Sequence, residues 1–506
     1  MSQYLYTRIV LSIAGAGLFF FWQGYKGFSL MDEGAFWYGA QRVLLGEVPI
    51  RDFMSYDIGR YYWSAAFMNI LDDNGIVALR VGSSVFQAIA LFTGLTVLIR
   101  NSANQNVLFW ILVIITLLVW GVPQFRLIDI SLPIITVGAL SFLVENPSRR
   151  RYFVTGLIVG FVAVFGRNHG MYAVAGSLGI IFYLTFKRDG EPGLVNAFTN
   201  WLFGVIVGYL PILVFLAVVP GFALAFWEHF PYLFANQASP LPLPVPWPWQ
   251  VAFGELPTFV SMRYVLIGVL FIFIVVYGLL GITWVIRSRL LKKPVSPVVV
   301  ATAFIALPYS HYAYSRADME HLALGIPPLI MGIFALLANQ SGWIKWSFAT
   351  LLCGVSIFML LPNHPGYYCK LDHLCVEAKV AEDSMLIDID TAGNLAGILQ
   401  FAEQFAPDDR TFLVAPSVPG IYAALGRKAP MWEIYALFPR NLAFQQSEIE
   451  RIKAAKPGFA LIINLPFDDR EDLRFSKTHP LVYKYILDNY ERWNTDLFVE
   501  RKSSTN

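Results

Sequence analysis

Leu30-Met31-Asp32-Glu33-Gly34 places two adjacent carboxylates shortly after the first apolar run of the chain, which covers residues 5–22. An apolar run of about 20 residues is long enough to cross a lipid bilayer. Ionisable side chains next to the hydrocarbon region are costly, so they mark candidate functional positions. The stretch therefore predicts a membrane protein that keeps reactive groups near the end of its first crossing, with Asp32 as a candidate catalytic base.

The composition agrees with a membrane protein. Of 506 residues, 56% are hydrophobic and 14% are charged, whereas a typical soluble domain has about 25% charged residues. The formal net charge of +2 gives no reason to expect a nucleic acid as partner. Within this first run, the hydrophobic stretch from about Ile9 to Trp22 follows Arg8 and has no small-residue cleavage site after it, so we expect a retained membrane span.

About eleven apolar runs are candidates for membrane spans: 5–22, 76–99, 106–121, 128–145, 152–167, 170–186, 198–219, 263–286, 296–313, 322–338 and 345–362. Basic residues mark the cytoplasmic loops by the positive-inside rule: Arg100, Arg149 to Arg151, Lys187 and Arg188, Arg287 to Lys293, and Lys345. The N-terminus is then cytoplasmic. The loops 23–75, 122–127, 220–262 and 314–321 and the tail from residue 363 are then extracytoplasmic.

The predicted fold is therefore an α-helical polytopic membrane domain over residues 1–362, followed by an extracytoplasmic α/β domain over 363–506. In the tail, 411–415 and 459–464 have the pattern of buried strands, and 392–406, 446–455 and 480–491 that of helices.

The first outer loop predicts two short interfacial helices. One runs from Glu33 to Leu45, with Asp32 as its N-cap and Pro49 as its stop. The other covers 60–70 and is closed by a turn at 72–75.

Two later segments predict irregular backbone. Gly166-Arg167-Asn168-His169-Gly170 predicts a tight hairpin or a broken helix. The alternating prolines of 239–249 predict an extended strap, either a plain spacer or a cover for a lipid-chain groove.

A second cluster of ionisable residues lies in a predicted short outer turn: Tyr314-Ser315-Arg316-Ala317-Asp318-Met319-Glu320-His321. Each cluster alone has a structural explanation, namely a helix cap in the first and a capping Asp318 paired with Arg316 in the second. Because both are expected on the same face of the membrane, we predict one joint site.

These motifs, with Gly46-Glu47-Val48-Pro49-Ile50-Arg51-Asp52-Phe53 between them, resemble bacterial polytopic glycosyltransferases of the GT-C superfamily. That group includes protein O-mannosyltransferases and the lipid A aminoarabinose transferase. The resemblance covers residues 1–362. It implies an enzyme of the bacterial inner membrane that transfers a hexosyl or pentosyl group from a polyprenyl-phosphate-linked donor to an acceptor glycan, lipid or protein. It also implies that Asp32 acts at the catalytic centre.

In this interpretation Asp32 takes the proton of the acceptor hydroxyl and the anomeric centre inverts. Glu33 is a second catalytic candidate. The remaining candidates would bind the donor phosphate or sugar: Arg51, Asp52, Asp57, Arg60, Arg167, His169, Arg316, Asp318 and His321. A divalent cation, Mg²⁺ or Mn²⁺, is a further expectation, with Asp32, Asp318, Glu320 and His321 as its candidate ligands.

Other functions remain open alternatives: a multi-span transporter or flippase for lipid or solute, and a polymerase or ligase of surface polysaccharide. Cys369 and Cys375 are spaced so that a disulfide can form outside the cytoplasm. A metal site formed by these cysteines with His364, Asp372 and His373 is the other interpretation of that segment.

Overall fold

The computed structural model describes residues 2–102, 106–185, 192–235, 241–371 and 373–501. Lys187, Arg188, Ser239, Pro240 and Asp372, which carried predictions above, lie outside these ranges. The chain divides into two compact units. Unit 1 consists of residues 1–24, 80–220 and 237–367, and unit 2 of residues 25–79, 221–236 and 368–506.

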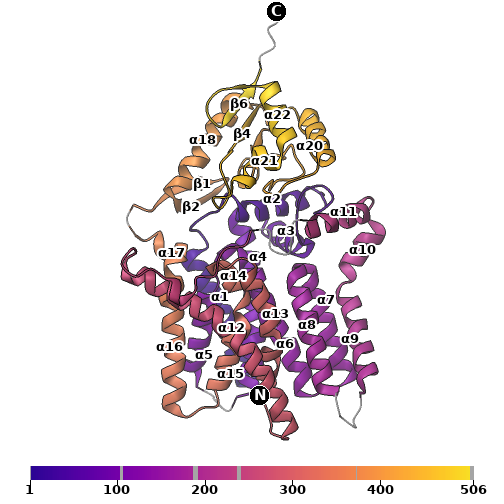
Figure 1. Ribbon diagram of the computed structural model, residues 1–506, viewed down its shortest axis with the longest axis vertical. Coiled ribbons are helices and arrows are strands. Elements are labelled where there is room, and N and C mark those ends of the chain that lie inside the picture. The colour runs from indigo at the N-terminus through magenta and orange to yellow at the C-terminus, as the bar shows by residue number, and fades with distance from the viewer. Residues whose placement is uncertain (1, 103–105, 186–191, 236–240, 372, 502–506) are drawn as a thin grey trace, which may run out of the picture. The chain divides into compact units, whose positions relative to one another are not determined.

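Unit 1 is helical, and Figure 1 labels its elements. Its helices are α1 (Ser2–Gln23), α4 (Ile76–Arg100, mostly in unit 1), α5 (Val107–Val119), α6 (Leu127–Glu145), α7 (Arg149–Phe165), α8 (Arg167–Thr185), α9 (Leu194–Gly208), α10 (Leu210–Val218), α12 (Thr258–Leu290), α13 (Pro297–Ser315), α14 (Met319–Gly325), α15 (Pro327–Leu337), α16 (Gly342–Leu360) and α17 (Pro365–Tyr368, at the boundary with unit 2). Short 3₁₀ turns are η1 (Gln124–Arg126), η2 (Pro248–Gln250) and η3 (Leu361–Asn363).

Each of the eleven predicted apolar runs forms a helix or a bent pair of helices. Among the described residues, five helical segments are long and apolar enough to cross a membrane, and the bent pairs α9–α10 and α14–α15 raise the number to seven. Helix α5 has only 13 residues, and α7 begins with three arginines. The mainly helical architecture is confirmed, and a count of eleven spans stays a prediction.

Helices α7 and α9 approach through glycines spaced four residues apart on each helix. A Cβ atom on Gly156 would lie 2.0 Å from the Trp201 carbonyl oxygen, and one on Gly208 would lie 2.0 Å from the Leu157 carbonyl oxygen. Small residues at this spacing let two membrane helices pack backbone to backbone. Any larger side chain at these positions would force the helices apart.

The predicted break at 166–170 is confirmed. Helix α7 ends at Phe165, Gly166 adopts an extended conformation, and α8 begins at Arg167. A Cβ atom on Gly170 would lie 2.4 Å from Ala163 Cβ, so the two helices fold back tightly on each other.

Unit 2 combines the first loop, one later helix and the tail (Figure 1). Its helices are α2 (Asp32–Leu44), α3 (Ile58–Leu71), α11 (Phe222–Ala235), α18 (Ile389–Phe405), α19 (Gly420–Ala424), α20 (Leu442–Ala455), α21 (Phe475–Thr478) and α22 (Pro480–Asn489), with the 3₁₀ turn η4 (Glu471–Leu473). Its strands are β1 (Cys375–Val380), β2 (Asp383–Asp388), β3 (Leu413–Ala415), β4 (Phe459–Ile462), β5 (Tyr490–Arg492) and β6 (Leu497–Glu500).

The tail has an α/β core, as predicted. Strands β1 and β2 form an antiparallel hairpin, and the other four form a sheet in the order β3-β4-β6-β5. Strands β3 and β4 are parallel, whereas the β4–β6 and β5–β6 pairs are antiparallel. The Phe412 ring stacks between Tyr422 and Phe459, with centroid distances of 5.1 and 5.0 Å, which closes one end of this core.

The first loop is packed into unit 2. The backbone N–H of Gly27 donates to the Leu386 carbonyl (2.9 Å) and that of Leu386 to the Tyr25 carbonyl (3.0 Å), so residues 25–27 extend the β1–β2 hairpin. Eight of the 13 residues of α2 are buried, from Glu33 to Gln41 without Ala35. Protein therefore covers most of the surface of α2, and its position along a membrane interface stays a prediction.

Two details of the first loop also differ from the prediction. Met31, without a side-chain cap, is the N-cap of α2, and Asp32 is the first helical residue. The helix ends before Gly46, whose φ of +84° suits a glycine after a helix, so Pro49 is not needed as a stop. The turn after α3 is confirmed: Asp72 is left-handed, and Asp73 Oδ1 accepts from the Gly75 N–H at 2.7 Å.

Candidate functional site

The Asp32 side chain lies in the first turn of α2, partly exposed. A carboxylate there interacts favourably with the positive end of the helix dipole. The Tyr435 hydroxyl, from the tail, donates a hydrogen bond to Asp32 Oδ1 at 3.4 Å. The candidate base is therefore accessible and has a neighbour 403 positions away in the sequence.

Glu33 has a different environment from Asp32. It is 1% exposed, and its Oε2 accepts from the Ser29 backbone N–H at 3.4 Å. This carboxylate helps to fix the turn that precedes α2. Its predicted catalytic role stays a prediction.

The close packing of α2 against α19 explains why Gly34 follows the carboxylate pair. A Cβ atom on Gly34 would lie 2.3 Å from Gly420 Cα and 2.6 Å from Gly420 N. The Gly420 N–H donates to the Leu30 carbonyl at 2.9 Å. Tail residues thus hold both sides of the turn that carries Asp32.

The segment 429–437 of the tail is hydrogen-bonded to the first loop next to this turn. The Met54 N–H donates to the Trp432 carbonyl (2.9 Å), and the Trp432 indole donates to the Ile50 carbonyl (3.0 Å). The Ala429 N–H donates to the Tyr38 hydroxyl (3.0 Å). The sequence analysis missed Tyr435 and its segment, because nothing in their spacing points to a partner in the first loop.

A buried ion-pair network holds segment 429–437 in place. Glu433 pairs with Arg440 (2.7 Å) and with His479 Nε2 (2.8 Å). Glu448 Oε2 accepts from the Trp432 backbone N–H at 2.8 Å, and Glu448 also pairs with Arg451. Burial raises the pKa of Glu448 to about 7, although the Arg451 charge opposes this shift.

Arg51 and Asp52 form an ion pair with each other at 2.7 Å. Asp52 Oδ2 also accepts from the Val48 N–H at 2.7 Å. Burial raises the pKa of Asp52, but the Arg51 and Val48 hydrogen bonds outweigh it, so this pKa lies below its usual value. Both predicted donor-binding residues are therefore charged and tied into the loop between α2 and α3.

Asp57 and Arg60 lie at the start of α3. Arg60 donates to Asp57 Oδ2 at 3.2 Å, and Asp57 is 9% exposed. This pairing places the two predicted sugar-binding residues together in unit 2.

In unit 1, the second predicted cluster forms one hydrogen-bonded group between α13 and α14. Arg316 Nε donates to Asp318 Oδ2 at 2.8 Å. Asp318 Oδ1 lies 2.8 Å from both the backbone N and Nδ1 of His321, so Asp318 is the N-cap of α14. Burial raises the pKa of Asp318, but the bonds and charge of His321 and the Arg316 bond lower it below its usual value.

The proline strap lies against this cluster. Arg316 NH1 donates to the Leu241 carbonyl at 3.3 Å, and Trp247 stacks on Trp249 with a centroid distance of 5.3 Å. A Cβ atom on Gly268 of α12 would lie 2.0 Å from the Pro246 carbonyl oxygen. Residues 242–247 of the strap form neither helix nor strand, as predicted, whereas 248–249 belong to the 3₁₀ turn η2; the Pro246 contact seats the strap on α12.

Asp129 is a candidate residue that sequence analysis missed. It is 1% exposed within an apolar helical segment, and its Oδ1 lies 3.4 Å from Nε2 of His169. Nδ1 of His169 lies 3.0 Å from the Tyr309 hydroxyl. The signal that could have found it is a lone carboxylate inside a predicted span, which marks a functional candidate by default.

His169 is itself 1% exposed and lies in the first turn of α8, as does Arg167. A direct contact between His169 and a donor phosphate stays a prediction.

The metal prediction has limited support from these contacts. Within the described residues, no group of three or more His, Cys, Asp and Glu side chains is arranged to hold a metal ion. Both oxygens of Asp318 accept hydrogen bonds from Arg316 and His321, and a metal at this cluster stays a prediction. Asp32 belongs to unit 2 and Asp318, Glu320 and His321 to unit 1, and the joint site stays a prediction.

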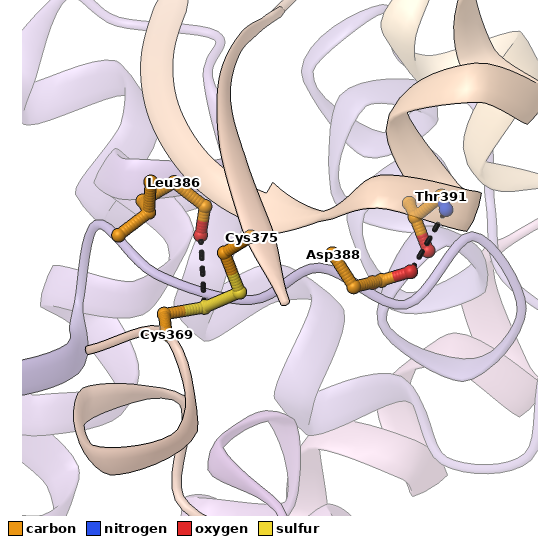
Figure 2. The surroundings of a disulfide bond; sticks show 5 residues. All are labelled: Cys369, Cys375, Leu386, Asp388 and Thr391. Carbon is orange, nitrogen blue, oxygen red and sulfur yellow. Dashed lines mark hydrogen bonds between the residues drawn. A yellow bond between two sulfur atoms is a disulfide. The ribbon is translucent and has the colours of Figure 1, made fainter. Parts of the chain in front are cut away.

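Cys369 and Cys375 form a disulfide (Figure 2), which decides between the two interpretations of that segment. Cys369 Sγ lies 3.6 Å from the Leu386 carbonyl oxygen of β2. Nearby, Asp388 caps α18 by accepting from the Thr391 N–H at 2.8 Å. His364, the proposed partner for a metal, is instead buried against Gln23 and the Val119 carbonyl, both at 2.9 Å.

The protein-family models contain no match to this chain, and the search of curated proteins also finds none. Among solved structures, the chain is similar to the oligosaccharyltransferase of Archaeoglobus fulgidus. The apo form has 11% identity and a TM-score of 0.46, with 91% of this chain and 69% of that chain covered. The form tethered to an acceptor peptide has 10% identity and a TM-score of 0.46, with 98% and 74% covered.

A third similar structure is archaeal oligosaccharyltransferase AglB from the same organism, in complex with an inhibitory peptide and a dolichol-phosphate. It has 12% identity and a TM-score of 0.43, with 90% of this chain and 69% of that chain covered. At this identity and TM-score the similarity assigns no activity or substrate to this chain.

Proposed function

We propose that this protein is an integral-membrane glycosyltransferase that moves a sugar from a polyprenyl-phosphate-linked donor to an acceptor hydroxyl. The observation that carries the proposal is the placement of Asp32. This carboxylate is partly exposed at the start of α2 and is held from the tail by Tyr435 and by the Gly34–Gly420 contact. The motif resemblance over residues 1–362 supplies the reaction class.

Asp32 has the chemistry of a general base in this reaction. The acceptor hydroxyl must lose a proton as its oxygen attacks the anomeric carbon, and a carboxylate within hydrogen-bond reach accepts that proton. Attack opposite the departing phosphate inverts the anomeric centre. The leaving lipid phosphate needs no proton, because its charge is stabilised by positive groups already in place.

Arg316 is our candidate for that stabilisation. Its bonds to Asp318 and to the Leu241 carbonyl fix the orientation of the guanidinium. A planar, permanently charged guanidinium suits phosphate oxygens. Arg51, Arg60 and Arg167 are further candidates. We assign His169 and Asp129 a positioning role, because their buried contact orders the first turn of α8, where Arg167 lies.

The proposal includes an orientation. The N-terminus is cytoplasmic in the bacterial inner membrane, and residues 363–506 form an extracytoplasmic domain. The Cys369–Cys375 disulfide supports this side for the tail, since disulfides persist in oxidising compartments. The acceptor is then a glycan, lipid or protein of the cell envelope.

Asp32→Asn tests the proposal. The purified full chain is given radiolabelled polyprenyl-phosphate sugars and a membrane extract as the source of acceptor, and release of polyprenyl phosphate is measured. We expect a loss of about 10²–10⁴-fold in turnover with donor binding retained. Asp390→Asn is the matched control, because Asp390 is an exposed carboxylate in the first turn of another helix of unit 2.

Equal turnover of Asp32→Asn and the control would remove Asp32 as the base. Movement of intact donor lipid across vesicles by wild-type protein, with no transfer for any sugar tried, would favour the flippase alternative.

A further inference from the structure

Unit 1 contains a second feature that the proposed reaction does not use. A cavity of about 350 Å³ lies between α4, α6 and α7, within the range of small-molecule sites. Most of its wall is apolar and includes Phe92, Ile135, Phe142 and Ile158. Because this wall is formed by apolar side chains of membrane-span candidates, the cavity suits a hydrocarbon chain.

One end of the cavity is polar. Arg100, Asn101 and Glu145 line it there, and Arg100 and Glu145 are the last residues of α4 and α6. Phe92 precedes Arg100 by eight residues of the same helix, which corresponds to about 12 Å along the helix axis. The cavity therefore has a charged end and an apolar body, as a lipid does, and its length accommodates part of an acyl chain.

The charged end is net positive. Glu145 Oε1 pairs with Arg100 at 2.9 Å and its Oε2 with Arg151 at 3.1 Å, so two cations share one carboxylate. Arg149 and Arg150 precede Arg151 and are exposed.

Arg8 of α1 adds to this charge. It is close enough to Arg100 for the two charges to repel. Its Nε is buried and has no hydrogen-bond partner within the described residues. Arg100, Arg151 and Arg8 thus lie close to one another around Glu145, and Arg149 and Arg150 come directly before Arg151 in the chain.

We propose that this cavity binds one chain of an anionic glycerophospholipid, with the lipid phosphate lying against Arg100 and the neighbouring arginines. The positive-inside rule puts these arginines at the cytoplasmic surface, and basic pockets between membrane helices on that side bind anionic head groups. None of the lining residues belongs to the site proposed above, so this proposal does not rest on the transfer reaction.

Photo-crosslinking of the full chain in nanodiscs tests the site. The probe is phosphatidylglycerol that carries a diazirine in one acyl chain, and phosphatidylcholine with the same chain is the comparison. Crosslinked peptides are located by mass spectrometry. We expect crosslinks to cavity-wall residues of α4, α6 and α7 from phosphatidylglycerol, several-fold above those from phosphatidylcholine.

Two variants separate the charged end from the apolar body. Arg100→Gln lowers the yield about fivefold, as expected for one arginine at an anionic lipid surface, and Arg100→Lys restores most of it. Ile158→Trp fills the cavity and removes the crosslinks. Arg287→Gln, at an exposed arginine of α12, and Ile206→Trp, at an exposed position of α9, leave the yield unchanged.

Three results would overturn the proposal. The first is equal crosslinking by both phospholipids. The second is a crosslink yield that does not change in Arg100→Gln and Ile158→Trp. The third is stronger displacement of the probe by polyprenyl phosphate than by unlabelled phosphatidylglycerol. Variants are compared only where gel-filtration elution matches the wild type, so a folding defect cannot imitate loss of the site.

Discussion

Replacing Gly34 by alanine perturbs the contact that fixes the candidate base. The added Cβ would lie 2.3 Å from Gly420 Cα and 2.6 Å from Gly420 N. Both neighbours are backbone atoms of α19, so no side chain can rotate away to make room. The α2–α19 contact must open, and overpacking of this kind costs about 1–3 kcal/mol.

The helix itself would gain from the same substitution. Alanine stabilises a helix interior by about 0.5–1 kcal/mol over glycine, so the net expected loss is about 0–2.5 kcal/mol. For a domain of 150–250 residues, 1 kcal/mol corresponds to about 2–4 °C in unfolding midpoint. We therefore expect Gly34→Ala to lower the midpoint of the full chain in detergent by up to about 10 °C.

Gly393→Ala provides the matched control. Gly393 lies inside α18 in the same unit, and a Cβ atom there would meet nothing within 4 Å. This variant should raise the midpoint slightly. Transfer activity should fall in Gly34→Ala and not in Gly393→Ala, because only the first displaces Asp32. If both variants stabilise the protein equally, α2 and α19 do not approach as closely as described.

Two further predictions concern the segment that holds Asp32. Tyr435→Phe removes the 3.4 Å hydrogen bond to Asp32, which is worth about 0.5–1.5 kcal/mol. The kcat of this variant should fall up to about tenfold with KM unchanged, whereas the control Tyr485→Phe should have no effect. An unaltered kcat would show that Tyr435 does not orient the proposed base. Glu448 has its pKa raised to about 7 by burial, so its stabilising contribution is complete below about pH 4.5 and is lost as the pH rises through 7. The loss amounts to about 3 kcal/mol. In Glu448→Gln the unfolding midpoint should therefore decrease less between pH 5 and 8 than in the wild type. An equal decrease of the midpoint with pH in both proteins would contradict this assignment.

Sequence periodicity was sufficient to predict most helices and the buried strands, but it did not predict which segments pack against one another. Helices α1, α4 and α12 follow from apolar runs, and strands β3 and β4 from short apolar stretches, because burial leaves a pattern in the residues themselves. The short strands β5 and β6 were missed, since three or four residues carry too little pattern. The burial of α2 was not predicted, because the segment that packs against it comes from the distant tail.

The residues of the candidate site likewise fall into those that the sequence made conspicuous and those that it did not. Asp32, Arg316 and Asp318 were predictable, because charge beside a predicted span is conspicuous. Tyr435 was not, since its partner is 403 residues away and one sequence carries no record of that pairing. Asp129 was overlooked although it has the same signal as Asp32, because the run around it was judged only by its length and apolar content.

The tail is therefore part of the candidate site rather than an appendage to the membrane domain. Gly420 and Tyr435 contact the turn that carries Asp32, and Trp432 holds the loop that follows α2. Glu448 in turn holds the Trp432 backbone, so the position of Asp32, the proposed base, depends on a buried carboxylate in the tail. A change in the tail that loosens these contacts would lower the proposed transfer activity by moving Asp32, even if it left the proposed donor and acceptor sites unchanged.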